Sequence, residues 1–341
     1  MANITSKPVP AFGANDALKL DEEKLKEWRL NMPLEEKWYT LADDELEFYR
    51  KETGIQDAEK IKAHILQVQA DAYKVYPYPC IRRFSFTTLK ISRYPAYQDL
   101  LKLGRERSGA LFLDIGCCCR SNYTVPDVKR KINTVIFTLV GNDVRKAVAD
   151  GFPVDQALAS DLRPAFWDLG HTLFKSTPES FPVPFLAGDV FDSNFLSVVP
   201  PFTTKPTAPA PSLKDITSLT PLNGHLSAIH ASAFFHLFDE AGQTIVAKAF
   251  AGLLSPEPGS IIFGSHRGEL QKGYRTKAHK DDRERFGHSP ETWQEMWHKD
   301  VFGEGKVKTW AILKETERKD MEEHFGPGVK FYLLVWSVTR L

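Results

Sequence analysis

The sequence has few cysteines, no net charge and no long apolar run, and each absence excludes a class of protein. It has 4 cysteines in 341 residues, Cys80 and the run Cys117–Cys119, and so lacks both a disulfide framework and the spaced pairs of a zinc site. Lys plus Arg and Asp plus Glu number 44 each, so no overall field favours nucleic acid or an anionic membrane. The apolar stretches are far shorter than a membrane span, and the first residues lack the pattern of a secretory signal. We therefore expect a cytoplasmic protein that binds no metal, nucleic acid or membrane.

The order of patterns along the chain divides it into an arm, a helical part and an alternating part. The length suits one large α/β domain with additions, or two domains. Residues 1–20 are polar, with Pro and Gly, which predicts a loose arm. Residues 21–104 show helical spacing of apolar side chains, and helices are predicted over Asp43–Lys51, Asp57–Tyr73 and Leu89–Leu103. Because these helices precede every predicted strand, we expect a helical cap that also carries the entrance for a substrate.

An aromatic, proline-stiffened segment, Tyr76–Phe84, links the predicted cap to the rest of the chain. It contains Tyr76, Tyr78 and Arg82, which are candidate substrate residues. Segments of this kind serve either as packed connectors or as entrances lined with aromatic rings. Both interpretations stay open at this point.

Residues 105–341 alternate between predicted strands and helices. This alternation is typical of a doubly wound, mostly parallel α/β sheet with helices on both faces. Residues 199–221 are rich in Pro, Thr and Ser and predict a surface loop between the third and fourth strands. The strands are predicted at the following segments: Gly109–Gly116, the residues before Arg163, Leu186–Asp189, Leu226–Ser232, Gly259–Gly264, Val307–Leu313 and Val329–Ser337.

The first three strands each end on a small or acidic residue. Gly116 after the first strand would let a ligand approach the backbone closely, and Asp161 after the second could accept both hydroxyls of a ribose. Asp189 after the third could face the edge or amino group of a base. Any one of these acids alone is as well explained as a turn residue. Together they predict a nucleoside site.

Four motifs in this order resemble those of class I S-adenosylmethionine-dependent methyltransferases, in particular fungal enzymes of meroterpenoid and related secondary-metabolite pathways. The motifs begin at Asp114-Ile-Gly-Cys-Cys, Ser160-Asp-Leu-Arg, Gly188-Asp-Val-Phe-Asp and Ile229-His-Ala-Ser-Ala-Phe-Phe-His. The resemblance implies a Rossmann-like, seven-stranded sheet whose last strand pairs antiparallel at the edge. It also implies S-adenosylmethionine as cofactor and methylation of a small hydrophobic, terpenoid-like metabolite, on a carboxyl or hydroxyl oxygen. A homodimer is compatible with the sequence.

The same resemblance implies which residues meet the cofactor and the acceptor. The expected cofactor residues lie at the three strand tips and the first core helix: Asp114, Gly116, Cys117, Gly141, Asp161, Leu162, Asp189 and Val190. His230 and His236 flank the fourth strand tip, where a histidine could take a proton from a hydroxyl acceptor. His266, Arg267 and His288 could bind an acidic substrate. The competing interpretations are a packed side chain for His230, a residue on a helix face for His236 and a solvated surface loop for the segment that carries His288.

Residues 120–140 interrupt the first motif. The family pattern would run from Cys119 directly into Gly141-Asn-Asp-Val-Arg-Lys, and removing the 21 residues between reduces the step from Gly116 to Asp161 from 45 positions to 24. The ribose-binding acid of dinucleotide folds follows the glycine turn by about 20 residues. Our hypothesis is an intron translated in frame; the alternative is a genuine loop that gates the site. Two rival functions also stay open, a non-catalytic binding protein with a spoiled cofactor loop and a nicotinamide-dependent oxidoreductase.

The insertion generates a first prediction. If residues 120–140 derive from an intron, S-adenosylmethionine should bind the chain that lacks them and not the chain that contains them, which calorimetric titration of the two proteins measures. Tight binding by both would make the segment a tolerated loop, and a mature transcript that is continuous through codons 119 to 141 would contradict the intron hypothesis.

Overall fold

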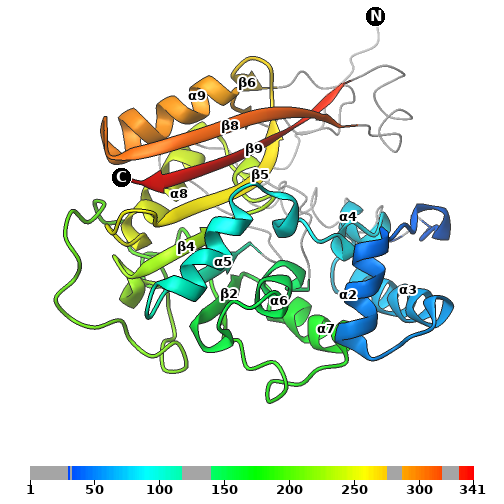
Figure 1. Cartoon of the computed structure of the whole chain (residues 1–341). Coiled ribbons are helices and arrows are strands. Elements are labelled where there is room, and N and C mark those ends of the chain that lie inside the picture. The colour runs from blue at the N-terminus through cyan, green and yellow to red at the C-terminus, as the bar shows by residue number, and fades with distance from the viewer. Residues whose placement is uncertain (1–29, 31–32, 117–139, 275–285, 317–329) are drawn as a thin grey trace, which may run out of the picture.

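A seven-stranded sheet in the order β3-β2-β1-β4-β5-β9-β8 forms the centre of the molecule (Figure 1). The structure, a computed structural model, describes residues 30, 33–116, 140–274, 286–316 and 330–341. The strands are β1 (Leu111–Ile115), β2 (Ala157–Asp161), β3 (Phe185–Ala187), β4 (Leu226–His230), β5 (Ile261–Gly268), β8 (Val307–Thr316) and β9 (Phe331–Arg340). A two-stranded ribbon, β6 (Gly273–Tyr274) and β7 (Phe286–Gly287), follows β5.

The first five strands of the sheet are parallel, which confirms the prediction of a doubly wound, mostly parallel fold. The expected edge position of the last strand is wrong. β9 pairs antiparallel with both β5 and β8, and β8 forms the edge. The physical reason is visible in the side chains: Leu334, Val335 and Trp336 of β9 are buried, whereas Lys308 of β8 is exposed. A strand that is apolar on both faces is favoured inside a sheet, and charged residues protect an edge.

Alternate residues of the strands enter two separate hydrophobic cores. Phe112 of β1 packs into the core under α5 (Tyr97–Glu106), α6 (Asn142–Ala149) and α7 (Pro164–Phe174), whereas its neighbour Leu113 packs into the opposite core. The opposite core lies under α8 (Glu240–Leu253) and α9 (Pro290–Glu295), which continues as the π-helix η7 (Met296–Phe302). This period of two follows from the pleat of a strand. Trp293 and Trp297 are fully buried in that core.

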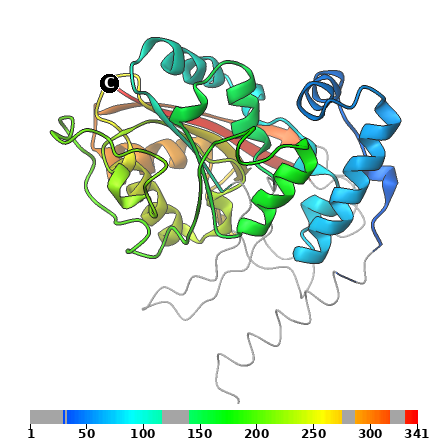
Figure 2. The ribbon, with the colours of Figure 1, turned by 90° about the horizontal axis from the view of Figure 1, so that it is seen from below.

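The N-terminal helices lie beside α7, at one side of the sheet (Figure 2). α2 (Asp43–Thr53) and α3 (Ala58–Val75) confirm the two helices predicted there. Asp57 caps α3 by accepting from the backbone N–H of Lys60, and Gly54 ends α2 at φ 72°. The apolar stripe of α3 is buried: Ile61, Ile65, Val68 and Ala72. The short elements around these helices are η1 (Glu36–Trp38), α4 (Pro79–Arg82), η2 (Ser85–Thr87) and η3 (Ile91–Arg93).

The continuous helix predicted over Leu89–Leu103 is wrong. The chain forms the single turn η3, and α5 begins only at Tyr97. Pro95 explains the break, because proline lacks an N–H and disfavours helical geometry in the residue before it. Tyr94, the residue before this proline, is extended at φ −93° and ψ 139°.

Residues 199–221 connect β3 to β4 without helix or strand before the turn η5 (Thr220–Leu222), as predicted for a loop. Leu213 and Leu219 are buried and anchor this loop to the core under α8. In the described part of the chain, none of the helices combines the length and apolarity that a bilayer span requires.

The buried stripe of α3 generates a stability prediction. Ile65 is 0% exposed, so Ile65→Ala should lower the free energy of unfolding by about 2 to 4 kcal/mol through lost burial and the cavity left behind. Chemical denaturation would measure this, with Leu270→Ala as the control because Leu270 is 64% exposed. Equal midpoints for both variants would show that α3 does not belong to the cooperative core.

Candidate active site

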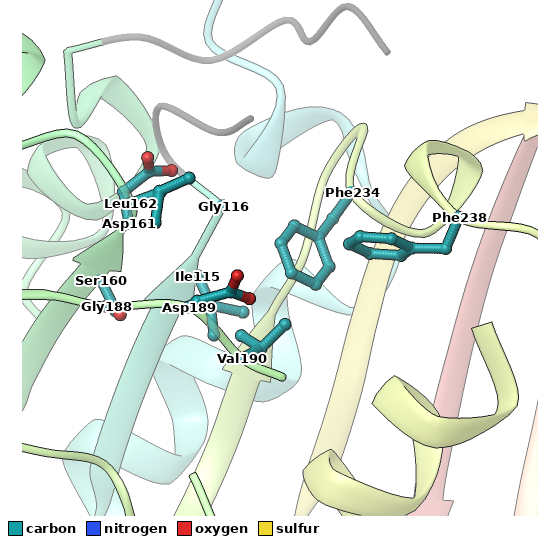
Figure 3. A pocket seen from close by; sticks show the side chains of 10 residues that line it. All are labelled: Ile115, Gly116, Ser160, Asp161, Leu162, Gly188, Asp189, Val190, Phe234 and Phe238. Carbon is teal, nitrogen blue, oxygen red and sulfur yellow. The ribbon is translucent and has the colours of Figure 1, made fainter. Parts of the chain in front are cut away.

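A crevice opens at the carboxyl ends of β1, β2 and β3 (Figure 3). Because the strands are parallel, their tips meet at one edge of the sheet, which is where open α/β folds bind ligands. The lining combines two carboxylates with small and apolar residues from the strand tips and from the segment after β4: Ile115, Gly116, Ser160, Asp161, Leu162, Gly188, Asp189, Val190, Phe234 and Phe238.

Gly116 is required at its position for two reasons. Its φ is 79°, and a Cβ atom there would lie 2.4 Å from the Phe234 ring. Its backbone N–H donates to the carbonyl oxygen of Ser160 at 3.0 Å, which fixes the backbone between β1 and β2. The glycine therefore adopts a conformation that other residues rarely adopt, and it lets the Phe234 ring pack directly against the tip of β1.

Asp161 and Asp189 stand on opposite sides of the crevice. Asp161 is 2% exposed, and its Oδ1 accepts from the backbone N–H of Arg163 at 3.1 Å. Asp189 is half-buried, and its Oδ1 accepts from the N–H of Phe191 at 3.0 Å. Burial is the main cause that raises the pKa of Asp189. Its carboxylate points toward Phe234 across the crevice (Figure 3).

Two phenylalanines from the segment after β4 close the crevice and were not singled out from the sequence. Phe234 and Phe238 pack edge to face, with ring centroids 5.3 Å apart, and Phe238 also contacts Phe191 at 5.0 Å. Ala233 precedes them at φ 55°, a conformation that turns the chain sharply after β4. The aromatic run directly after a strand tip was the signal that could have identified them.

Asp114 lies beneath the crevice, and each of its two carboxylate oxygens takes part in a hydrogen bond. Sheet register places it directly beside His230 of β4, and its Oδ1 lies 2.8 Å from Nδ1 of His230. Its Oδ2 accepts from the backbone N–H of Val144 at 3.2 Å, which caps the first turn of α6. One buried carboxylate thus joins β1, β4 and α6.

The hydrogen bonds continue beyond His230. Its Nε2 lies 2.8 Å from Oγ of Ser232, which lies 2.8 Å from the hydroxyl of Tyr94. The Tyr94 hydroxyl also lies 2.7 Å from Oγ of Ser265 on β5. Tyr94 comes from the segment between η3 and α5, so a residue of the N-terminal region completes this network.

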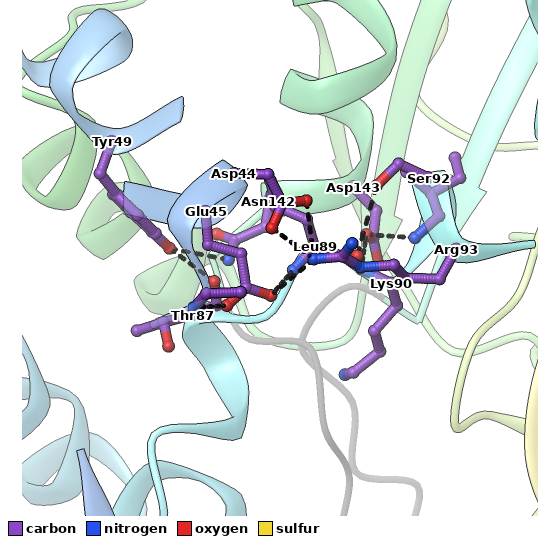
Figure 4. A network of polar contacts seen from close by, with 12 residues as sticks. Asp44, Glu45, Tyr49, Thr87, Leu89, Lys90, Ser92, Arg93, Asn142 and Asp143 are labelled. Carbon is purple, nitrogen blue, oxygen red and sulfur yellow. Dashed lines mark hydrogen bonds and ion pairs between the residues drawn. The ribbon is translucent and has the colours of Figure 1, made fainter. Parts of the chain in front are cut away.

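The start of α6 is tied to the N-terminal region by buried polar contacts (Figure 4). Oδ1 of Asp143 accepts from the backbone N–H groups of Lys90 and Ile91, each at 2.9 Å. The amide of Asn142 donates to the hydroxyl of Tyr49 at 3.0 Å and to the carbonyl of Phe86. Desolvation is the main cause that raises the pKa of Asp143.

Gly141, another expected cofactor residue, is not part of the crevice lining. Gly141 is the N-cap of α6 at φ 69°, and a Cβ there would lie 2.6 Å from the Trp167 ring. Its role in the structure is close packing against α7. Cys117 lies outside the described residues.

The connector Tyr76–Phe84 runs beside the crevice. Tyr76 and Tyr78 are buried, with ring centroids 4.4 Å apart, and the guanidinium of Arg163 lies 5.0 Å from the Tyr76 ring centroid. Since Arg163 follows directly on the crevice residues Asp161 and Leu162, the connector packs against the β2 tip. Arg82 instead pairs with Glu35 at 3.0 Å.

The other expected substrate residues, His266, Arg267 and His288, do not line the crevice, and neither does the candidate base His236. His266 is buried in the core under α9, where its Nδ1 accepts from the indole N–H of Trp336 at 2.9 Å, and His288 is buried nearby. His236 is also buried, on the turn η6 (Phe235–Leu237). Arg267 pairs with Glu269 at 3.1 Å. The structure thus does not bring these four side chains together with the crevice.

Comparison with known proteins gives consistent matches. A family model described as the meroterpenoid methyltransferase N-terminal domain matches residues 38–87. The O-methyltransferase phiE of a fungal species is 31% identical over 284 residues, covering 83% of this chain and 78% of that protein. The asnovolin E/chermesin D methyltransferase nvfJ of Aspergillus novofumigatus is 27% identical over 281 residues, covering 82% and 83%. Among solved structures, geranyl diphosphate C-methyltransferase from Streptomyces coelicolor A3(2) aligns at TM-score 0.42 and 11% identity, covering 98% of this chain and 100% of that one.

The buried histidines generate a prediction about pH. Burial lowers the pKa of His288 to about 4, whereas an unfolded histidine titrates near 6.5. The unfolded chain therefore takes up this proton first, so the stabilisation is complete above about pH 6.5 and is lost as the pH falls toward 4. Between pH 7 and 4 the free energy of unfolding should fall less in His288→Asn than in the native chain, by about 2 kcal/mol. His225→Asn is the comparison: His225 is only partly buried and burial lowers its pKa in the same direction, so its pH profile should differ less from that of the native chain. Identical pH profiles for all three proteins would contradict the prediction.

Proposed function

Because the chain belongs to the fungal secondary-metabolite branch of the S-adenosylmethionine-dependent methyltransferases, we propose that it methylates an oxygen atom of a small hydrophobic, terpenoid-like metabolite. Membership makes the chain a methyltransferase and S-adenosylmethionine its methyl donor. The observation that carries the proposal is the crevice itself, with Asp161 and Asp189 on its two sides and the Asp114–His230 pair beneath it.

The residues of the crevice fit an adenosine group. Ribose hydroxyls are donors that suit the carboxylate of Asp161, and an adenine amino group suits that of Asp189. Leu162 and Val190 offer apolar surface for the flat base, and Phe234 offers a ring face from the other side.

Bound S-adenosylmethionine supplies a methyl group on a positively charged sulfur. The task of the chain is then to hold the acceptor oxygen in line and to exclude water, which accounts for much of the acceleration in such transfers. No nucleophilic side chain or metal is required for this chemistry. Tyr76 and Tyr78, packed beside the β2 tip, suit the wall of an entrance for an apolar acceptor.

His230 is the better supported of the two candidate bases. Asp114 accepts from its Nδ1, which orients the ring and would stabilise an imidazolium, as an acid partner does for a catalytic histidine. A carboxylate acceptor is already ionised and needs no base, whereas a hydroxyl acceptor does.

The proposed function is tested by methyl transfer and by cofactor binding. The chain should transfer a tritiated methyl group from S-adenosylmethionine to a lipophilic probe acceptor, either dodecanoic acid or 4-nonylphenol. Asp189→Asn should weaken binding of S-adenosylhomocysteine by about 10- to 100-fold, because a charged hydrogen-bond partner is lost. Calorimetry measures the binding.

Asp192→Asn is the matched control, since Asp192 lies three positions further along the same loop and is exposed. It should bind S-adenosylhomocysteine as the native chain does. Equal affinity in Asp189→Asn would remove the crevice from the proposed cofactor site. The absence of binding to both folded forms of the chain, with and without residues 120–140, would overturn the function.

A further inference from the structure

Five side chains, from β1, β4 and the residues after it, β5, and the segment between η3 and α5, form one continuous chain of hydrogen bonds. It runs from Asp114 to His230 at 2.8 Å, to Ser232 at 2.8 Å, to Tyr94 at 2.8 Å and to Ser265 at 2.7 Å. Every step is short enough for proton transfer between the atoms that it joins. The proposed function needs a base when the acceptor is a hydroxyl group, and these hydrogen bonds end on the buried Asp114–His230 pair.

The Asp114 carboxylate at one end determines which group donates in each of the hydrogen bonds that follow. An ionised Asp114 can only accept, so Nδ1 of His230 carries a proton and donates to it. In the neutral imidazole Nε2 is then an acceptor, and the Ser232 hydroxyl donates to it. Because the Ser232 hydroxyl donates its one hydrogen to His230, it must act as the acceptor in its hydrogen bond with the Tyr94 hydroxyl. Protons can therefore move from Tyr94 toward His230.

Direct contact between His230 and an acceptor is excluded by geometry. Both ring nitrogens are engaged and the side chain is 1% exposed, whereas Tyr94 is 8% exposed and is the most accessible of the five. Ser232 and Ser265 are 2% and 3% exposed. We propose that Tyr94 takes the proton of an acceptor hydroxyl and passes its own through Ser232 to His230.

The step balances as a concerted proton transfer. The acceptor O–H bond breaks, and its proton binds the Tyr94 oxygen as the Tyr94 proton moves to Ser232 and the Ser232 proton moves to Nε2 of His230. The acceptor oxygen keeps the electron pair of the broken O–H bond and is thereby made a stronger nucleophile. His230 becomes an imidazolium held by Asp114, and both hydroxyl groups are restored.

The surroundings of Tyr94 favour a concerted transfer over a free phenolate. Burial, and secondarily the nearby Asp143, raise the pKa of Tyr94, with Asp114 acting in the same direction. The backbone N–H of Lys90 donates to Asp143, and the pKa of the Lys90 side chain is lowered mainly by burial. Tyr94 therefore stays protonated except while it exchanges one proton for another. Ser265 holds the phenol oxygen in place.

This inference rests on the proposed function and narrows it, because only a hydroxyl acceptor needs the relay. Tyr94→Phe keeps the ring contacts with His230 and Phe263 and removes only the hydroxyl. It should lower kcat with 4-nonylphenol by about 100-fold or more and leave kcat with dodecanoic acid within about threefold of the native value. A purely structural hydroxyl would change both rates alike.

Tyr97→Phe is the matched control, since the Tyr97 hydroxyl donates to Asp150 away from the relay. Both variants should bind S-adenosylhomocysteine as the native chain does, which separates failure of the relay from failure of the fold or of the cofactor site. An unchanged phenol rate in Tyr94→Phe would overturn the relay while leaving the methyltransferase function intact.

The direction of hydrogen-bond donation between Asp114 and Tyr94 can be tested without any methyl acceptor. Nitrogen-15 spectra of the histidine rings, with His230 assigned by its loss in His230→Gln, should show Nδ1 protonated and Nε2 unprotonated above neutral pH. A proton on Nε2 would mean that His230 donates to Ser232, and this would overturn the relay even if neither probe were methylated.

Discussion

The site depends on a single buried carboxylate. Asp114 is fixed beside His230 by the register of β1 and β4, and it also accepts from the first turn of α6 through Val144. Removing one partner of such a group leaves a buried charge without compensation, which costs more than the hydrogen bond itself is worth. The tips of β1 and β4 and the start of α6 are therefore held together by Asp114. The crevice lies directly above them, so its shape depends on these contacts.

Hydrogen bonds hold the N-terminal region against the start of α6, next to the site. Asp143 accepts from Lys90 and Ile91, while Asn142 bonds Tyr49 of α2, so the segment between the cap and β1 is held against α6 (Figure 4). That anchoring places Tyr94 within reach of the β4 and β5 tips. The N-terminal region therefore does not only pack beside the sheet. Its segment before α5 places the hydroxyl of Tyr94 beside Ser232 and Ser265 at the centre of the sheet.

Local patterns in the sequence predicted the parts of the site that each strand carries by itself. Asp161, Leu162, Asp189 and Val190 line the crevice as expected, because a buried strand followed by an acid has a fixed direction in a parallel sheet. The order of the last two strands and the break before Tyr97 were predicted wrongly, since strand order depends on competition for burial and the helix end on Pro95. Phe234 and Phe238 were missed, because an aromatic run reads the same whether it packs in a core or closes a crevice.

The sequence by itself determined the fold class, the three strand tips and the family, because these depend on periodicity and on motifs within a few residues of one another. Only the tertiary structure decided that Asp114 is engaged by His230, that His266 and His288 lie in the core under α9, and that Tyr94 joins Ser232 and Ser265. The hydrogen bonds among these residues join positions that are 70 to 171 residues apart in the sequence. Their partners are selected by sheet register and packing, and no local pattern encodes either.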